Sequence, residues 1–414
     1  MKVFINFLST FLIAYPIMMS LVWIVGAILY YLLVERKFNK EPQTKDVFEG
    51  ISFLIPCYNE AETIEETLTN VLNLSYPKKE IILINDGSSD DTVKKVTALK
   101  ELYDFKFIDL KENRGKANAL NTAVKEAQYD FVMGIDADTI IEDDAPYFMI
   151  ENFRKAPRLG AVTGNPRIRN KSSIFGKIQT VEYASIIGSI KRAQTMNGYV
   201  NTISGVFTLF RKSALKEVGY WDNDMITEDI AVSWKFHMNR FEILYEPRAL
   251  CWMLVPETFS GIWKQRLRWA QGGHEVVLRE FKHMFKKKSL PLWLLYLEQF
   301  LSIFWVYSVL FLLVFTVINI DFLDYYFYAY NFNILLLGSI ILTTVNIFQF
   351  TVSLIIDSRY EKKNILYLFF LCWYPTFYWL INACVAVCAF PKALRRKKGE
   401  FATWLSPDRG NIQR

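Results

Sequence analysis

The chain has 414 residues and a formal net charge of +6, and 16% of its residues are Phe, Tyr or Trp. Its apolar residues gather at the N-terminus and in the last third, which excludes a single soluble domain and indicates a soluble part joined to a membrane part. Lys and Arg lie beside the apolar stretches, which favours contact with membrane lipid over nucleic acid, and the five Cys include no CxxC pair of the kind that binds zinc.

The first apolar stretch, residues 7–34, is predicted to be a transmembrane helix. It exceeds the roughly 20 residues that a spanning helix needs, and it is longer than the core of a secretory signal. Glu35, Arg36 and Lys37 follow it, so the positive-inside rule places its C-terminal end in the cytoplasm. Residues 35–50 are expected to form a polar linker.

Residues 51–255 are predicted to form an α/β domain. Short β-rich apolar runs alternate with helical periodicity, a pattern typical of parallel strands joined by crossover helices. The expected strands are residues 51–55, 81–84, 105–110 and 131–135, and the expected helices are residues 62–72, 91–102 and 116–127. Ligands of such sheets bind at the carboxyl ends of the strands.

Polar residues follow the first two predicted strands. Pro56, Tyr58 and Glu60 come after the first strand, and Asp86 ends the second. These residue types also favour simple turns and helix caps, but at neighbouring strand ends they supply an aromatic face and carboxylates for a base and a ribose. Lys116 opens the next helix, where a cation opposes the helix dipole and therefore indicates an anionic partner such as a diphosphate.

The fourth predicted strand leads directly into Asp136 and Asp138. Two carboxylates this close repel each other unless a cation lies between them. We therefore expect Mg²⁺ or Mn²⁺ on Asp138, with Asp136 on the metal or on the sugar.

Two further motifs complete the candidate site. Glu228 and Asp229 follow Thr227 at the start of a helix, where an N-cap with acidic residues in the first turn is already a structural explanation. Residues 256–288 are predicted to be an interfacial amphipathic region that carries Gln265, Arg268 and Trp269. Guanidinium groups suit a departing diphosphate, and an indole suits a sugar ring.

Three more apolar segments are predicted to form a C-terminal transmembrane region over residues 291–390. They cover residues 291–320, 333–356 and 365–390, and Pro375 makes the last one a candidate for a broken helix. A basic tail, residues 391–414, follows. A full last span would place this tail outside, against the charge rule, so its side of the membrane stays open.

These motifs, in this order, resemble processive family 2 glycosyltransferases such as cellulose, chitin and hyaluronan synthases. A closer resemblance, which includes residues 163–167, 202–205 and 403–410, is to the members that polymerise β-1,6-linked N-acetylglucosamine. Asn85 stands where many members have a second Asp, so only Asp86 inherits the uridine-binding role. No appended cyclic-dinucleotide receptor domain is expected.

The resemblance implies a GT-A fold, a Rossmann-like nucleotide-sugar-binding domain inserted between transmembrane helices of a multi-pass bacterial membrane protein. It also implies inverting transfer from UDP-N-acetylglucosamine to a growing polysaccharide, with a small accessory membrane protein as partner. Asp229 would be the general base, with Glu228 next to it. Arg268 would stabilise the leaving diphosphate, and Gln265 and Trp269 would bind the acceptor. The rivals are a non-processive transferase acting on a polyprenyl phosphate and a catalytically dead membrane scaffold.

Overall fold

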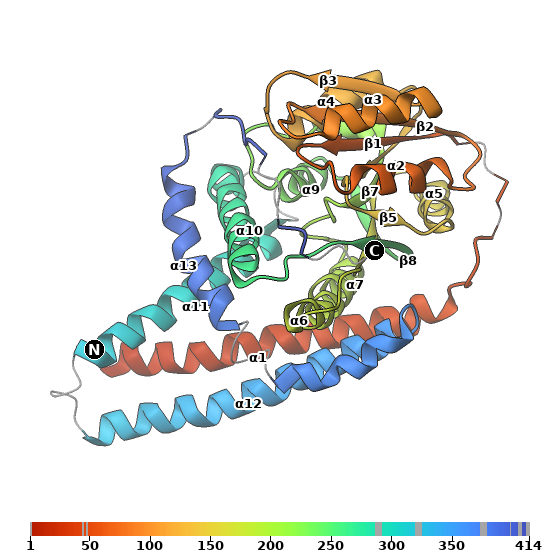
Figure 1. Cartoon of the computed structure of the whole chain (residues 1–414). Helices are drawn as coiled ribbons and strands as arrows, with labels where there is room; N and C mark the ends of the chain where they lie inside the picture. Colours follow the sequence, from red (N-terminus) through yellow and green to blue (C-terminus); the bar gives the residue numbers. More distant parts are fainter. Residues whose placement is uncertain are drawn as a thin grey trace.

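A computed structural model describes residues 2–43, 45–46, 49–285, 292–318, 325–372, 379–397, 399–404 and 408–410. An α/β domain lies above a set of long helices, as Figure 1 shows. The helices α1 (Lys2–Leu33) and α12 (Tyr325–Asp357) run side by side beneath the domain, although they are far apart in the sequence.

The first half of the α/β domain confirms the predicted strands and helices. Its strands pair in parallel in the order β3-β2-β1-β4, because each is followed by a helix that returns the chain to the same edge of the sheet. The strands are β1 (Ile51–Cys57), β2 (Lys79–Asp86), β3 (Lys106–Leu110) and β4 (Phe131–Ile135), and the helices are α2 (Ile64–Leu72), α3 (Thr92–Leu102) and α4 (Lys116–Glu126).

The second half of the sheet departs from a purely parallel arrangement. The full order is β3-β2-β1-β4-β7-β6-β8-β5, and β7 runs antiparallel to both β4 and β6. The additional strands are β5 (Ile140–Ile141), β6 (Leu159–Ile168), β7 (Phe207–Arg211) and β8 (Glu242–Met253). The helices between them are α5 (Ala145–Lys155), α6 (Ile174–Tyr183), the π-helical turn η2 (Ala184–Ser189), α7 (Ile190–Met196), α8 (Lys212–Glu217) and α9 (Glu228–Met238).

The core of the domain lies on both faces of the sheet. Successive side chains of a strand point to opposite faces, so Phe53 and Ile55 enter one apolar cluster while Leu54 enters the other. All seven residues of β1 are buried. A strand buried on both faces has a continuous apolar sequence, which explains why this strand could be predicted from the sequence.

Three helices among the described residues are long and apolar enough to cross a membrane, which makes the chain a membrane protein. They are α1 (Lys2–Leu33), α11 (Trp293–Ile318) and α12 (Tyr325–Asp357), with mean hydropathy of 2.3, 2.5 and 1.9 over their candidate spans. They correspond to the segments predicted at residues 7–34, 291–320 and 333–356. Side chains such as Val25, Leu313 and Leu337 point outward from them, as expected for a lipid-facing surface.

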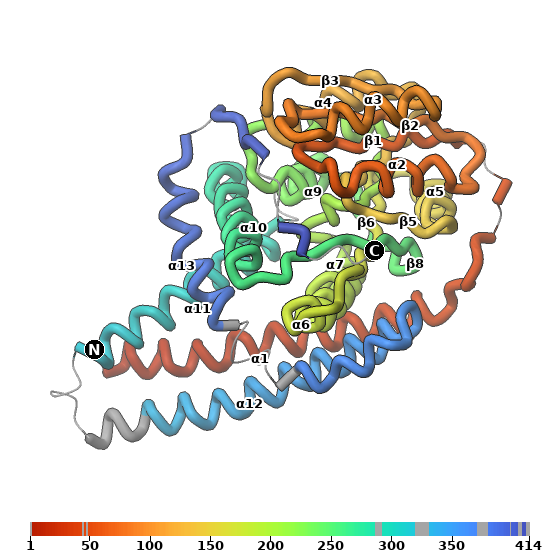
Figure 2. The backbone as a smooth tube through the Cα atoms, viewed as in Figure 1, coloured from red at the N-terminus to blue at the C-terminus, as the bar shows by residue number. Residues whose placement is uncertain are grey.

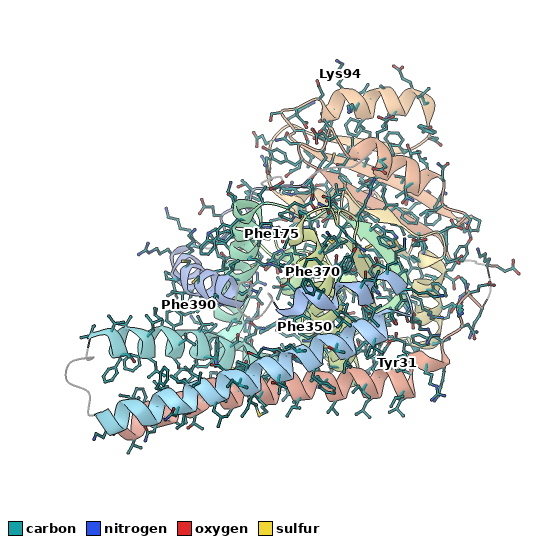
Figure 3. All side chains as sticks on the ribbon, turned by 60° about the horizontal axis from the view of Figure 1, so that its bottom comes forward. Tyr31, Lys94, Phe175, Phe350, Phe370 and Phe390 are labelled. Carbon is teal, nitrogen blue, oxygen red and sulfur yellow. The ribbon has the colours of Figure 1, made fainter. Side chains whose placement is uncertain are left out.

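The last predicted span is divided into a 3₁₀ segment, η5 (Lys362–Cys372), and the helix α13 (Trp379–Arg395). Pro375 lies outside the described residues. Figure 3 shows Phe175, Phe350 and Phe370 together where α6, α12 and η5 meet. The helix α13 packs along α10 (Phe259–Glu280), which continues into the short turn η3 (Phe281–His283). After α13 the chain returns to the α/β domain (Figure 2), where Trp404 is hydrogen-bonded to Asn113. The tail therefore lies against that domain.

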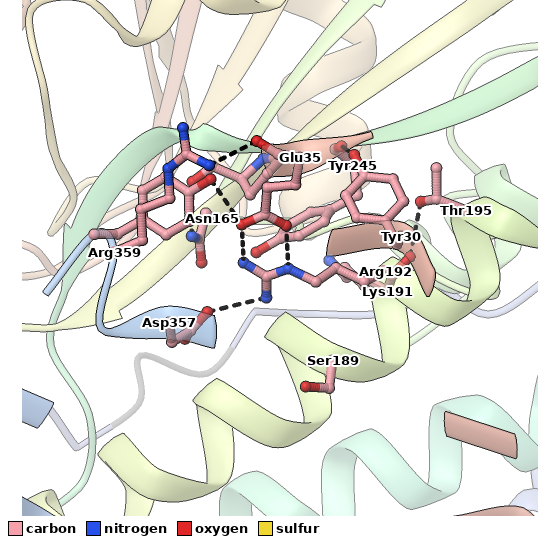
Figure 4. A network of polar contacts seen from close by, with 12 residues as sticks. Tyr30, Glu35, Asn165, Ser189, Lys191, Arg192, Thr195, Tyr245, Asp357 and Arg359 are labelled. Atoms are coloured by element: carbon pink, nitrogen blue, oxygen red, sulfur yellow. Dashed lines mark hydrogen bonds and ion pairs between the residues drawn. The ribbon is translucent and has the colours of Figure 1, made fainter. Parts of the chain in front are cut away.

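A buried network of charges joins the membrane helices to the domain (Figure 4). Glu35, in the turn η1 (Glu35–Lys37) after α1, binds the Arg192 guanidinium of α7 through two contacts of 2.6 and 3.0 Å. Asp357, at the end of α12, lies 3.0 Å from Arg192 and 2.5 Å from Arg167 of β6. Arg192, Glu35 and Asp357 have fully buried side chains, so each charge depends on its partners.

Candidate active site

The carboxylate of Asp86 is fixed by the loop that precedes α4. It accepts hydrogen bonds from the backbone N–H groups of Arg114, at 3.1 Å, and Gly115, at 2.7 Å. Burial raises the pKa of Asp86, and these two hydrogen bonds oppose the rise. Gly115 has a φ of +92°, and a Cβ there would lie 2.0 Å from the carbonyl oxygen of Ala402. The tail of the chain therefore presses directly on this loop.

The Tyr58 ring lies near the tail of the chain. It stacks with Trp404 at a centroid distance of 6.5 Å and an interplanar angle of 30°. Trp404 is held there by Asn113, whose side chain accepts from its N–H at 2.9 Å and donates to its carbonyl at 2.8 Å. Pro56 is a buried residue of β1. An aromatic pair thus stands at the predicted base-binding end of the first strand.

Asp136 and Asp138 lie in different charge environments. The Lys116 ammonium pairs with Asp136, donates to the Gly205 carbonyl at 3.0 Å and lies 3.5 Å from Glu228. Coulombic attraction to these carboxylates outweighs burial and raises the pKa of Lys116 to about 12. Lys116 therefore remains a cation at the centre of the site.

Asp138 instead pairs with Arg409 of the tail, which also pairs with Glu60. Asp138 and Glu60 are only 1% and 3% exposed. Burial raises the pKa of both carboxyls, to about 7 for Glu60, while the Arg409 guanidinium opposes the rise. Two buried carboxylates therefore share one guanidinium.

The same carboxylates fit a divalent cation by the chemistry of their oxygen donors. No group of three or more His, Cys, Asp or Glu residues within the described part of the chain is arranged to hold a metal. Asp136 and Asp138 nevertheless form a pair whose charge requires compensation, and Arg409 provides it at Asp138. The guanidinium thus stands where a cation would be favourable.

Glu228 and Asp229 begin α9 beside Lys116. Burial raises the pKa of both carboxyls, while Lys116 and Arg268 oppose the rise. A Cβ added to Gly205 would lie 3.2 Å from Asp229 Oδ2, so the turn at Gly205 packs closely on this carboxylate.

The expected capping role of Thr227 is not seen. Its side chain makes no cap hydrogen bond, and its Oγ1 is buried without a hydrogen-bond partner. It packs against Gly272 of α10, where a Cβ would lie 2.2 Å from Oγ1. The acidic pair after Thr227 is therefore not explained by helix capping alone.

A cavity of about 650 Å³ joins these groups to the motif on α10. Lys116, Glu228, Gln265 and Arg268 line it together with the tail. Trp269 is placed elsewhere: the Arg266 guanidinium stacks on its ring at 4.4 Å, and the ring packs against a separate apolar cluster. Of the predicted acceptor residues, only Gln265 faces the cavity.

Sequence reasoning missed the roles of Trp404 and Arg409. Both lie within residues 403–410, a segment of the tail that contributed only to the family resemblance. That resemblance was the one signal available, because nothing local in the tail indicates contact with strand ends that lie hundreds of residues earlier.

Comparison with known proteins assigns the family. Residues 52–219 match the model of glycosyl transferase family 2. A poly-β-1,6-N-acetyl-D-glucosamine synthase of Staphylococcus epidermidis is 64% identical over 407 residues, which cover 98% of this chain and 99% of the relative. The chain belongs to glycosyl transferase family 2. An equally named family 2 relative from Staphylococcus aureus is also 64% identical over the same share of both chains.

The solved structures support the expected fold of a family 2 glycosyltransferase. A mannosyltransferase from Pyrobaculum calidifontis, in complex with GDP-Man and Mn²⁺, superposes with a TM-score of 0.64. It is 20% identical and covers 94% of this chain and 100% of its own. The likeness confirms the GT-A fold.

Proposed function

We propose that this chain is a polysaccharide synthase that transfers N-acetylglucosamine from UDP-N-acetylglucosamine to a growing β-1,6-linked polymer. One observation carries the proposal: a single cavity brings Lys116 and Glu228 of the nucleotide domain against Gln265 and Arg268 of α10. The names of the 64% identical relatives support the polymer over the rival transfer to a lipid carrier. The three candidate membrane helices fit a synthase that also assists export.

The donor would be held along the strand ends. Asp86 would accept a hydrogen bond from the uridine, and the Tyr58 ring would contact the base. Lys116 and Arg268 would compensate the charge that develops on the diphosphate. Asp138, with Asp136, would hold Mg²⁺ or Mn²⁺, which supplies further charge compensation when bound. The Mn²⁺ in the mannosyltransferase structure supports a divalent cation.

Asp229 would act as the general base. It would take the proton from the acceptor hydroxyl as that oxygen attacks the anomeric carbon from the face opposite UDP. Burial raises its pKa, which makes it a stronger base than an exposed carboxylate, while the neighbouring cations Lys116, Arg268 and Lys191 oppose the rise. Gln265 would orient the acceptor within the cavity. Trp269, whose ring is covered by Arg266, would influence the site through that side chain and would not stack directly on a sugar.

The α/β domain would face the cytoplasm, where nucleotide sugars are made, and a small accessory membrane protein would complete the active enzyme. The decisive experiment incubates membranes containing the full chain with labelled UDP-sugars and determines the linkage of any polymer. Label from UDP-N-acetylglucosamine in a β-1,6-linked product is expected. Label found only in a lipid-soluble product would overturn the proposal in favour of transfer to a carrier.

A further inference from the structure

Lys191 of α7 is a buried ammonium that the mechanism above does not use. It is 4% exposed, and its Nζ donates to Ser204 Oγ at 2.6 Å and approaches Thr163 Oγ1 at 3.4 Å. Arg192, the next residue on α7, binds Glu35 and Asp357 instead (Figure 4). The two adjacent cations therefore bind different groups: Lys191 binds hydroxyls, and Arg192 binds carboxylates.

The hydroxyl that Lys191 binds belongs to the turn beside the proposed base. The Ser204 N–H donates to Thr163 Oγ1 at 2.7 Å, which ties this turn to β6. The next residue, Gly205, accepts a hydrogen bond from Lys116 and packs on Asp229 so closely that a Cβ would lie 3.2 Å from its Oδ2. Lys191 thus binds the turn at Ser204, while Lys116 binds it and Asp229 packs against it at Gly205.

The charge of Lys191 is not neutralised by a close partner. Its hydrogen-bond partners Ser204 and Thr163 are neutral hydroxyls, and no carboxylate among the described residues forms an ion pair with it. Burial lowers the pKa of Lys191 to about 7, and the negative charge of Asp229 is the largest influence that opposes this fall. The Cys251 thiol of β8 is the other titratable group that faces it. A neutral side chain would avoid the desolvation of a cation here, so packing alone does not explain a Lys.

The influence between Lys191 and Asp229 is mutual. Burial raises the pKa of Asp229, and Lys116, Arg268 and Lys191 each oppose that rise from three different helices. Burial raises the pKa of the adjacent Glu228, and the negative charge of Asp229 adds to that rise, so it is unfavourable to ionise both carboxyls at once. Two of these cations bind the turn directly: Lys191 at Ser204 Oγ and Lys116 at the Gly205 carbonyl.

We propose that Lys191 is a positioning residue for the transfer reaction: its ammonium fixes the Ser204–Gly205 turn against Asp229, and its charge favours the ionised carboxylate. The inference rests on the proposed role of Asp229 as base. Lys191 would therefore affect the rate of transfer without contacting either substrate.

The test compares the pH dependence of kcat for the full chain and three variants in detergent. Lys191→Gln can still donate to Ser204 but carries no charge, so Asp229 should protonate at a higher pH. On the acidic limb of the pH profile its kcat should be about tenfold below wild type, the effect of one pKa unit, and the two profiles should converge once Asp229 is ionised in both proteins. Lys191→Arg keeps the charge and should keep the wild-type acidic limb. Ser204→Ala should lower kcat without moving that limb.

Donor affinity serves as the check on folding, and Lys216→Met, on the exposed side of α8, is the control for loss of one positive charge. All variants should bind UDP-N-acetylglucosamine within about twofold of wild type. An equal loss for Lys191→Gln at every pH would overturn the proposal, because it would show a structural role only. An unchanged profile in both Lys191→Gln and Ser204→Ala would overturn it as well. Asp229→Asn, measured in parallel, separates the two ideas: if it remains active, the base assignment fails irrespective of Lys191.

Discussion

Asp138 and Arg409 are separated by 271 positions in the sequence, yet the carboxylate of one pairs with the guanidinium of the other. The pair holds the tail of the chain against the carboxyl ends of the parallel strands. Since Asp138 is also the proposed ligand of a divalent cation, a positive side chain and a metal ion are expected to compete for it.

Replacing Arg409 with Gln removes that competing charge. We expect the affinity of the protein for Mn²⁺ without donor to rise by about tenfold, equivalent to ~1.4 kcal/mol. Calorimetric titration of Mn²⁺ into the solubilised chain measures this affinity. Arg154→Gln, which opens a 2.6 Å surface pair with Glu49, is the matched control and should change nothing. Weaker Mn²⁺ binding in Arg409→Gln would show that the guanidinium assists the cation instead.

Asp138→Asn should abolish the dependence on divalent cations together with most of the activity. A neutral amide leaves the diphosphate charge less compensated, and the expected loss in polymer formation is about 10²- to 10³-fold. Label incorporation with and without excess EDTA measures it, with Glu126→Gln, in a surface pair with Lys106, as control. Full wild-type turnover in EDTA would contradict the metal assignment.

Asp229→Asn and Asp86→Asn should separate catalysis from donor binding. The first keeps the side-chain shape but loses the proton acceptor, so the rate should fall by about 10²- to 10⁴-fold while donor affinity changes little. The second removes a charge-assisted hydrogen bond and should weaken donor binding by roughly 1.5 to 3 kcal/mol. Calorimetry with UDP-sugar and label incorporation on the same preparations distinguish them. Near wild-type polymerisation by Asp229→Asn would make Glu228 the next candidate for the base.

The orientation of the α/β domain can be tested with a single cysteine at Lys125, an exposed residue near the end of α4. The native cysteines are replaced first, because Cys384 and Cys388 of α13 are exposed. The engineered thiol should react with an impermeant maleimide only after the cells are opened. Reaction in intact cells would place the domain outside and contradict the proposed use of cytoplasmic nucleotide sugars.

The sequence predicted β1 to β4 and the position of the acidic residues at their ends because the relevant information is local. Asp86, Asp136 and Asp138 each follow an apolar run, and parallel strands bring such residues to one edge. The antiparallel direction of β7 could not be predicted, because Phe207–Arg211 has the same composition whichever way it runs. Periodicity does not encode strand direction.

Two other features depend on packing between distant or competing groups. Arg409 shows nothing in its own surroundings that indicates Glu60 and Asp138 as partners. Trp269 was expected to be free for a sugar, but Arg266, three residues earlier on the same helix, lies over its ring. Residues three apart on a helix share a face, so the sequence allowed Arg266 to stack on Trp269. It could not show whether Arg266 or a sugar would occupy the face of the ring.

The network of Glu35, Arg192, Asp357 and Arg167 has a consequence for how the protein is made. Its four charges come from segments that leave the ribosome far apart in time, and Asp357 is the last to appear. Until α12 has been inserted, Arg167 lacks its carboxylate partner and Arg192 has only Glu35, and an unpaired buried charge costs several kcal/mol. We therefore expect the α/β domain to dock stably onto the membrane helices only after α12 has been inserted.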